Sequence, residues 1–229
     1  MSGTMPVIGM VGGIGPEPTI AYYRLFVAAG HQAVLINSVG VQRLLAAMFR
    51  QDLPFVTDYL SDAVSVLAKG GAAVGLIAAN TPHIVFHDAQ KRSSLPLVSL
   101  VEATCRHVRA RGLKRVALLG TRFTMAGRFY PDVFDAAGIH LVTPAPEDLL
   151  HVHDIYVNEL LQNQFLPETR LRLLQVIDRL IDTQGAEAVI LGGTELPLVL
   201  TDECHRGVPL LDTTRLHVEA ALQAVTPSA

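Results

Sequence analysis

The sequence predicts an α/β protein made of two similar halves, each with a parallel sheet wound on both sides by helices. Short apolar runs alternate with longer helical patterns along the whole chain. These runs are continuously apolar and do not alternate with polar residues. Continuous apolar runs are typical of strands that are buried on both faces of a parallel sheet. Several runs also recur in the second half in the same order. Alternation of strands and helices is typical of α/β folds.

Eight apolar runs are expected to form the strands. Each is rich in Val, Leu or Ile and is bounded by glycine, proline or polar residues, which favour turns. The runs are 6–12, 33–39, 72–79, 97–100, 116–120, 140–143, 188–192 and 210–212.

Two helices between these runs have clear ends. One begins at Pro167, a residue favoured in the first turn of a helix, and ends at Gly185. Its apolar stripe consists of Leu173, Val176, Ile177, Leu180 and Ile181. The other carries Leu60, Val64 and Leu67 and ends at Gly70 and Gly71.

A weak internal repeat divides the chain into two halves. Residues 8–13 resemble 116–121, residues 75–81 resemble 189–195, and residues 95–104 resemble 208–221. Three pairs in one order at similar spacing indicate a duplicated α/β unit. We therefore expect one domain over residues 1–100 plus 213–229 and a second over 101–212, related by a pseudo-twofold axis. The carboxyl ends of both sets of strands would then surround an active-site cleft between the halves.

Composition excludes several classes of protein. Of the 229 residues, 50% are apolar and 17% are charged, which is typical of a folded chain with a large core. The net charge of -3 gives no basic surface for nucleic acid. No apolar run approaches the roughly 20 residues of a membrane helix, and the amino terminus lacks the pattern of a signal peptide. We expect a soluble cytoplasmic protein with neither a nucleic-acid nor a membrane partner.

Polar and small residues follow the predicted strands. After the first strand, Gly12, Gly13 and Gly15 precede a helix that begins near Pro16. Such a turn brings backbone N–H groups toward an anion at a helix amino terminus, although a simple tight turn has the same sequence. It matches neither the dinucleotide-binding nor the P-loop pattern.

The later strand ends carry hydroxyl, amide and carboxylate groups. Groups of this kind suit a small carboxylate better than a phosphate, and no spacing of His, Cys or acidic residues here predicts a metal site. The residues are Asn80, Thr81 and His83 after the third strand, Thr121, Arg122 and Thr124 after the fifth, and Thr194 and Glu195 after the seventh.

Five segments, in order along the chain, resemble segments of the aspartate/glutamate racemase family. The members of this family are pyridoxal-independent amino-acid racemases. The five segments are IGMVGGIGPEPTIAYYR, AANTPH, VALLGTRFTM, LGGTELPLVL and PLLDTTRLHVEAAL. Together they span nearly the whole chain. The resemblance implies a small amino acid or other carboxylate as ligand, no organic cofactor, no metal, and a homodimer.

The chain departs from this family at the two motif cysteines. The resemblance aligns Ala79 with the cysteine of a C-N-T-x-H motif and Gly193 with that of a G-C-T-E motif. Racemisation by two thiols needs an acid and a base on opposite faces of one carbon, and neither residue carries a proton. Both replacements are expected to enlarge the cleft. Cys105 and Cys204 lie elsewhere in the sequence and are interpreted as structural.

Other residues are candidates for the acid–base chemistry. His83 has a side chain that titrates near neutral pH, although it could instead orient a neighbouring loop. Glu195 is a carboxylate at a helix start, where it could also be a structural acceptor of backbone N–H groups. Asp212 is a weaker third candidate. Arg122 could pair with a carboxylate of the ligand, although a solvated arginine fits the sequence equally well, and Arg50 is a weaker candidate for a distal carboxylate.

These observations favour an isomerase or lyase that works through a carbanion without thiols. The retained strand-end residues fit equally well in a catalytically inactive family member that binds a small carboxylate as a sensor. A racemase whose two cysteines were replaced by design is a further alternative. Proton exchange at the α-carbon of a ligand distinguishes catalysis from binding alone.

Overall fold

The computed structural model describes residues 5–226 and divides the chain into two compact units. The first unit comprises Met1–Leu100 and His217–Ala229, and the second comprises Val101–Leu216. The chain was expected to return to the first domain at residue 213. It returns four residues later, at His217, inside the last helix. The first four and last three residues of the expected first domain lie outside the described residues.

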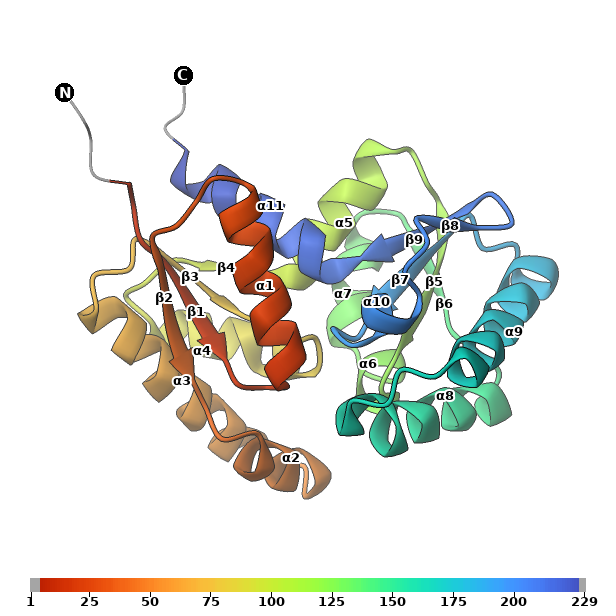
Figure 1. Cartoon of the computed structure of the whole chain (residues 1–229), viewed down its shortest axis with the longest axis horizontal. Coiled ribbons are helices and arrows are strands. Elements are labelled where there is room, and N and C mark those ends of the chain that lie inside the picture. Colours follow the sequence, from red (N-terminus) through yellow and green to blue (C-terminus); the bar gives the residue numbers. More distant parts are fainter. Residues whose placement is uncertain (1–4, 227–229) are drawn as a thin grey trace. The chain divides into compact units, whose positions relative to one another are not determined.

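The first unit is a parallel four-stranded sheet with helices along it (Figure 1). The strand order is β2-β1-β3-β4. Its strands are β1 (Ile8–Gly12), β2 (Val34–Ser38), β3 (Val74–Ile77) and β4 (Leu97–Val98). Its helices are α1 (Pro16–Ala28), α2 (Val41–Phe49), α3 (Leu53–Lys69), the 3-10 turn η1 (Thr81–Val85), α4 (Phe86–Arg92) and most of α11 (Thr213–Val225).

Strand register brings the carboxyl ends of β1, β2 and β3 to one edge of this sheet. Gly12 lies opposite Ser38, and Val11 lies opposite Ile77. Strands β1 and β3 are buried, and α3 packs on them through Leu60, Val64 and Leu67. Asp52 caps α3 by accepting a hydrogen bond from the Phe55 amide at 3.2 Å, as an N-cap residue does.

The second unit contains a five-stranded sheet of order β6-β5-β7-β9-β8. Its strands are β5 (Arg115–Gly120), β6 (His140–Val142), β7 (Ala188–Gly192), β8 (Cys204–His205) and β9 (Val208–Asp212). Its helices are α5 (Leu100–Ala110), α6 (Arg122–Met125), α7 (Phe129–Ala136), α8 (Pro146–Asn158), the 3-10 turn η2 (Leu160–Gln162), α9 (Pro167–Gln184) and α10 (Leu196–Val199).

The predicted fold class is confirmed, with two sheets in which parallel pairing dominates. All eight predicted strand regions contain strands, and among the strands of residues 5–226 only β8 pairs in the antiparallel sense, with β9. The helix predicted to begin at Pro167 does so and ends where Gly185 adopts the left-handed conformation, φ 64°. The sequence analysis missed β8 because its two residues are too few to form a pattern.

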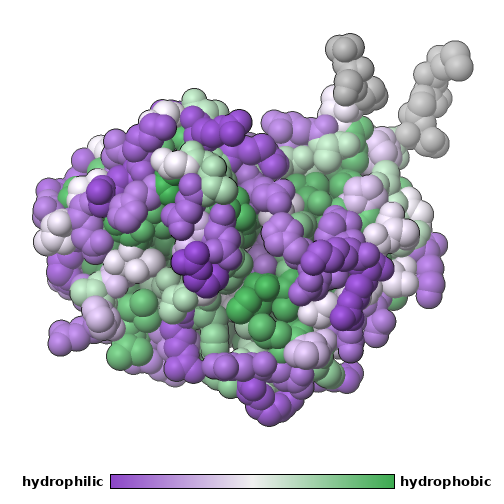
Figure 2. All heavy atoms as spheres, turned by 180° about the vertical axis from the view of Figure 1, so that it is seen from behind, coloured by the Kyte–Doolittle hydropathy of each residue, from purple (hydrophilic) through white to green (hydrophobic). Residues whose placement is uncertain are grey.

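The surface combines polar and apolar side chains. On the side opposite to Figure 1, hydrophilic groups cover much of the molecule and apolar groups appear between them (Figure 2). Within residues 5–226, no helix is long and apolar enough to cross a membrane.

Candidate functional site

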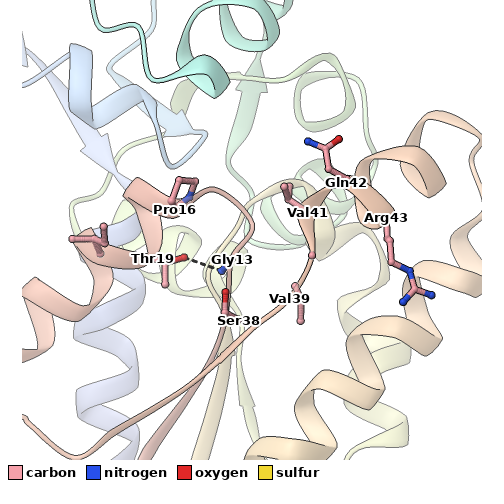
Figure 3. Close-up of a pocket in the computed structure, with 10 residues that line it drawn as sticks. Gly13, Pro16, Thr19, Ser38, Val39, Val41, Gln42 and Arg43 are labelled. Atoms are coloured by element: carbon pink, nitrogen blue, oxygen red, sulfur yellow. Dashed lines mark hydrogen bonds between the residues drawn. The ribbon is translucent and has the colours of Figure 1, made fainter.

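The glycine turn after β1 is closed by its own hydrogen bonds. Gly13 has φ +80°, and a Cβ there would lie 2.4 Å from the Val39 carbonyl oxygen, so only glycine fits. The Gly13 amide donates to Thr19 Oγ1 at 2.9 Å, and that hydroxyl donates to the Gly15 carbonyl at 2.9 Å (Figure 3). The turn therefore holds the backbone close to the loop after β2, and Gly13 uses its amide within the turn.

A groove of about 550 Å³ lies beside this turn, at the carboxyl ends of β1 and β2. The start of α1, the loop after β2 and the first turn of α2 line it (Figure 3). Among the described residues that line it, Arg43 is the charged one, and Thr19, Ser38 and Gln42 are polar. The Arg43 side chain lies at the α2 end of the groove, apart from Thr19 and Ser38 (Figure 3), and its positive charge suits an anionic ligand.

Arg43 is held by aromatic residues of α3. Its guanidinium carbon lies 5.7 Å from the ring centroid of Phe55 and 5.3 Å from that of Tyr59, within the range of cation–π contacts. The two rings stack on each other, with centroids 5.7 Å apart. Arg43 was not predicted from the sequence, whereas Arg50 was; Arg50 follows the last residue of α2 and so lies at the other end of that helix. The feature that could have indicated Arg43 is its position in the first turn of a helix that follows a strand.

His83 anchors two segments of the first unit. Its Nδ1 lies 2.8 Å from the Ala79 carbonyl oxygen, and Nε2 accepts a hydrogen bond from the Leu100 amide at 3.0 Å. Because Nε2 accepts, the proton of the neutral ring sits on Nδ1. Burial lowers the pKa of His83 to about 4, and the ring stacks on Phe86. This geometry favours the orienting role over proton transfer.

The other predicted residues after β3 lie at the same sheet edge. Ala79 and Asn80 are buried, and Thr81 begins η1. The backbone bends sharply here, since the Ala79 amide donates to the Ile77 carbonyl at 2.8 Å.

In the second unit, β5, β7 and β9 also end at one edge. Gly120 lies opposite Gly192, and Leu191 lies opposite Asp212. Thr121 caps α6 and accepts a hydrogen bond from the Thr124 amide at 3.3 Å. The Thr121 and Thr124 hydroxyls are also 3.3 Å apart.

The two remaining predicted residues at this edge differ in burial. Arg122 is exposed, with its guanidinium carbon 5.0 Å from the Phe123 ring centroid. Asp212 caps α11 by accepting from the Thr214 amide at 2.8 Å and the Arg215 amide at 3.3 Å. Burial raises the pKa of Asp212 in spite of these bonds. The capping bonds give this carboxylate a structural role.

A buried carboxyl lies at the end of β7. Glu195 is 4% exposed, and its Oε2 accepts hydrogen bonds from the Tyr156 hydroxyl and, at 3.1 Å, from Thr194 Oγ1. Burial raises the pKa of Glu195, although both hydrogen bonds lower it. Burial and the neighbouring carboxyl raise the pKa of Tyr156 well above its usual value. Burial therefore disfavours the charged form of each of the two groups.

Gly193 borders this pair, and the space beside it is filled. A Cβ on Gly193 would lie 2.3 Å from Cε2 and 2.6 Å from the hydroxyl oxygen of Tyr156. The expectation that Gly193 enlarges the cavity is therefore wrong, because the phenol occupies that volume. The sequence analysis did not single out Tyr156, whose position on α8 is typical of a core residue.

The two cysteines are both free. Cys105 is buried in α5 and its thiol contacts the Val133 carbonyl at 3.8 Å, and burial raises its pKa. Cys204 is exposed in β8. The described part of the chain contains no cluster of three or more His, Cys, Asp or Glu residues arranged for a metal ion.

Comparison with known proteins gives the family. The model of the Asp/Glu/Hydantoin racemase family matches residues 11–221. A glutamate racemase of Parafrankia is 34% identical over 147 residues, which are 63% of this chain and 51% of that protein, so the match spans about half of the relative.

Solved structures match over nearly the whole chain. A candidate Asp/Glu racemase from Yersinia pestis superposes with a TM-score of 0.84 at 30% identity, over 96% of this chain and 99% of the other. An aspartate racemase homologue from Pyrococcus horikoshii gives 0.81 at 28% identity, over 97% and 100%. A glutamate racemase from Francisella tularensis, at 13% identity and a TM-score of 0.72, shares the fold. The family match over residues 11–221 and these relatives show that the chain belongs to the Asp/Glu/Hydantoin racemase family.

Proposed function

We propose that this protein is a cofactor-independent isomerase or lyase that acts on a small carboxylate or amino acid through a carbanion. The observation that carries the proposal is the buried Glu195 carboxyl, which lies at the carboxyl end of β7 in contact with a phenol and a hydroxyl. Family membership supports the class of reaction, and the assignment of Glu195 as the acid–base group rests on the residues around it.

Glu195 is a carboxyl group whose pKa is raised by burial. A buried carboxyl without a cationic partner is costly to ionise, so its pKa rises toward the range in which general acids and bases are effective. A removed α-proton would pass to this carboxylate, and the carbanion would recover a proton or expel a leaving group. Buried acids with a raised pKa at the carboxyl edge of a parallel sheet are good candidates for catalysis.

The proposal does not use thiols. By resemblance, Ala79 and Gly193 occupy the positions of the family's two cysteines, and neither side chain holds a proton. His83 has both ring nitrogens engaged in hydrogen bonds. Glu195 is therefore the acid–base group that the described residues favour most.

The groove in the first unit supports an anionic ligand. Arg43 gives it a positive charge, and a guanidinium pairs with a carboxylate through two parallel hydrogen bonds. We propose that Arg43, together with Ser38, binds a small carboxylate ligand in this groove. The chain is expected to act as a homodimer, which light scattering after gel filtration tests directly.

Proton NMR in D₂O tests the function. We expect the α-proton signal of L- or D-aspartate, or L- or D-glutamate, to decay in proportion to protein concentration, and other small dicarboxylates form a second panel. Glu195→Gln should abolish the decay. Glu203→Gln, which changes an exposed acid of the same unit, should leave it unchanged.

Two results would contradict the proposal. Exchange that survives Glu195→Gln would remove Glu195 from the reaction. Ligands that raise the melting temperature without any exchange across both panels would instead identify a binding protein of the same family.

A further inference from the structure

We propose that Tyr156 is the residue that positions the Glu195 carboxyl for proton transfer, and that position 193 is glycine because the Tyr156 ring fills the space of any side chain there. This inference rests on the proposed function of Glu195. It concerns three residues brought together from two segments, since Tyr156 lies on α8 and the others follow β7.

The first step of the argument is packing. Tyr156 is 4% exposed and belongs to the core cluster of the second unit. A Cβ on Gly193 would approach three atoms of the phenol to 2.3–2.8 Å, far inside van der Waals contact. The ring can keep its place only if residue 193 has no side chain. Gly193 and Tyr156 therefore form a matched pair.

The second step is hydrogen bonding. The Tyr156 hydroxyl and the Thr194 hydroxyl both donate to the same atom, Glu195 Oε2. With Oε2 occupied by two donors, a proton taken up by the carboxyl goes to Oε1. The phenol thus determines which oxygen exchanges protons and fixes the orientation of the carboxyl.

The third step concerns the charges around Glu195. The groups that act on its pKa are burial, the two hydroxyls and its own backbone amide. Several charged side chains of α6, α8 and α9 contact other groups. These pairs are Arg170 with Asp202, Arg172 with Glu159 and Arg179 with Asp148, while Arg122 lies over Phe123 and His153 contacts the Arg122 amide. Among the described residues, Tyr156 is therefore the titratable side chain that contacts the Glu195 carboxyl.

Two substitutions break the same contact from opposite sides. Tyr156→Phe removes the hydroxyl and keeps the ring, whereas Gly193→Ala keeps the phenol and displaces it. The hydrogen bond from Tyr156 lowers the pKa of Glu195, so its loss should raise that pKa in both variants. The matched control is Tyr130→Phe, which changes a fully buried tyrosine of the same unit whose hydroxyl contacts Thr104.

Infrared difference spectroscopy on the whole protein gives a readout that needs no substrate. The carbonyl band of the protonated carboxyl is assigned by its loss in Glu195→Gln and followed against pH. We expect its midpoint to rise by about one pH unit, a tenfold change in proton affinity, in Tyr156→Phe and Gly193→Ala. Tyr130→Phe should match the wild type. A midpoint that does not move in Tyr156→Phe, whose shape is nearly conserved, would overturn the inference even if Gly193→Ala fails to fold.

The exchange assay then separates this inference from the proposed function. Where the wild type exchanges α-protons, the acidic limb of its pH profile should move upward in Tyr156→Phe by the same amount as the infrared midpoint. A profile that overlays the wild type would show that Tyr156 does not act through Glu195. If the infrared midpoint shifts but the protein exchanges no α-protons, the inference that Tyr156 positions Glu195 is supported and the proposed catalytic function is refuted.

Discussion

The Leu100 amide donates a hydrogen bond to Nε2 of His83 at 3.0 Å, which ties the start of α5 to the segment after β3. Since Nδ1 of the same ring bonds to the Ala79 carbonyl, the imidazole bridges two backbone segments. A buried ring with both nitrogens engaged is a structural element. Two predictions depend on this relationship.

The first prediction is that His83→Ala destabilises the protein without changing its chemistry. The variant leaves a buried amide and a buried carbonyl without side-chain partners, at a cost of about 1–3 kcal/mol each. Urea unfolding should show this loss, while the rate of α-proton exchange per folded molecule stays near that of the wild type. A stable but inactive variant would return His83 to the list of acid–base groups.

The second prediction concerns the pH dependence of stability. The pKa of His83 is about 4 in the folded state and about 6.5 in the unfolded state, so the unfolded chain binds more protons between these values. Stability from this residue is fully present above pH 6.5 and is lost as the pH falls to 4, by roughly 3 kcal/mol. His83→Gln should remove that part of the pH dependence. Urea midpoints of the two proteins at pH 7, 5.5 and 4.5 test this, and parallel curves would contradict it.

The fold could be predicted because its signals are local. Buried parallel strands form continuous apolar runs, and α9 is delimited by Pro167 and Gly185. The position of Glu195 directly after β7 also followed from the sequence. Its bond to Tyr156 did not, because the partner is 39 residues away and a tyrosine on α8 looks like any core residue.

The orienting role of His83 was one of the two expected from the sequence, but its partners were not, and Arg43 was not predicted at all. The bond from Leu100 to His83 joins residues 17 apart, and no local pattern specifies it. Arg43 and Arg50 both lie near α2, and choosing between them required the residue at which that helix begins. Helix boundaries depend on packing as well as sequence, and they differ by one or two residues between criteria.

The third prediction is that a cysteine at position 193 does not restore thiol chemistry on its own. Gly193→Cys places its Cβ against the Tyr156 ring and should lower stability by about 1–3 kcal/mol, the usual cost of overpacking. Gly40→Ala is the matched control, because a Cβ there makes one ordinary contact, 3.6 Å from the Tyr59 hydroxyl. Thermal unfolding compares the two variants, and equal melting temperatures would refute the packing argument.

The fourth prediction is that alkylation leaves any activity intact. Iodoacetamide should modify Cys204, which is exposed, before Cys105, whose buried thiol has a raised pKa. Mass spectrometry of the intact protein reports the extent of modification, and the exchange assay reports activity in the same sample. Loss of exchange in step with one modified thiol would show that a cysteine takes part in the reaction.

The fifth prediction separates the two arginines near α2. Arg43 lines the groove at the first turn of the helix, and Arg50 lies at its opposite end, roughly 10 Å away at 1.5 Å per residue. Loss of a charge-assisted pair with a ligand carboxylate costs about 1.5–3 kcal/mol, so Arg43→Met should weaken binding by about 10- to 100-fold. Arg50→Met should leave it unchanged, since it removes the same charge from the same helix without touching the groove. Ligand titration followed by NMR line shifts measures both, and equal losses in the two variants would indicate a long-range effect of net charge in place of a direct contact at Arg43.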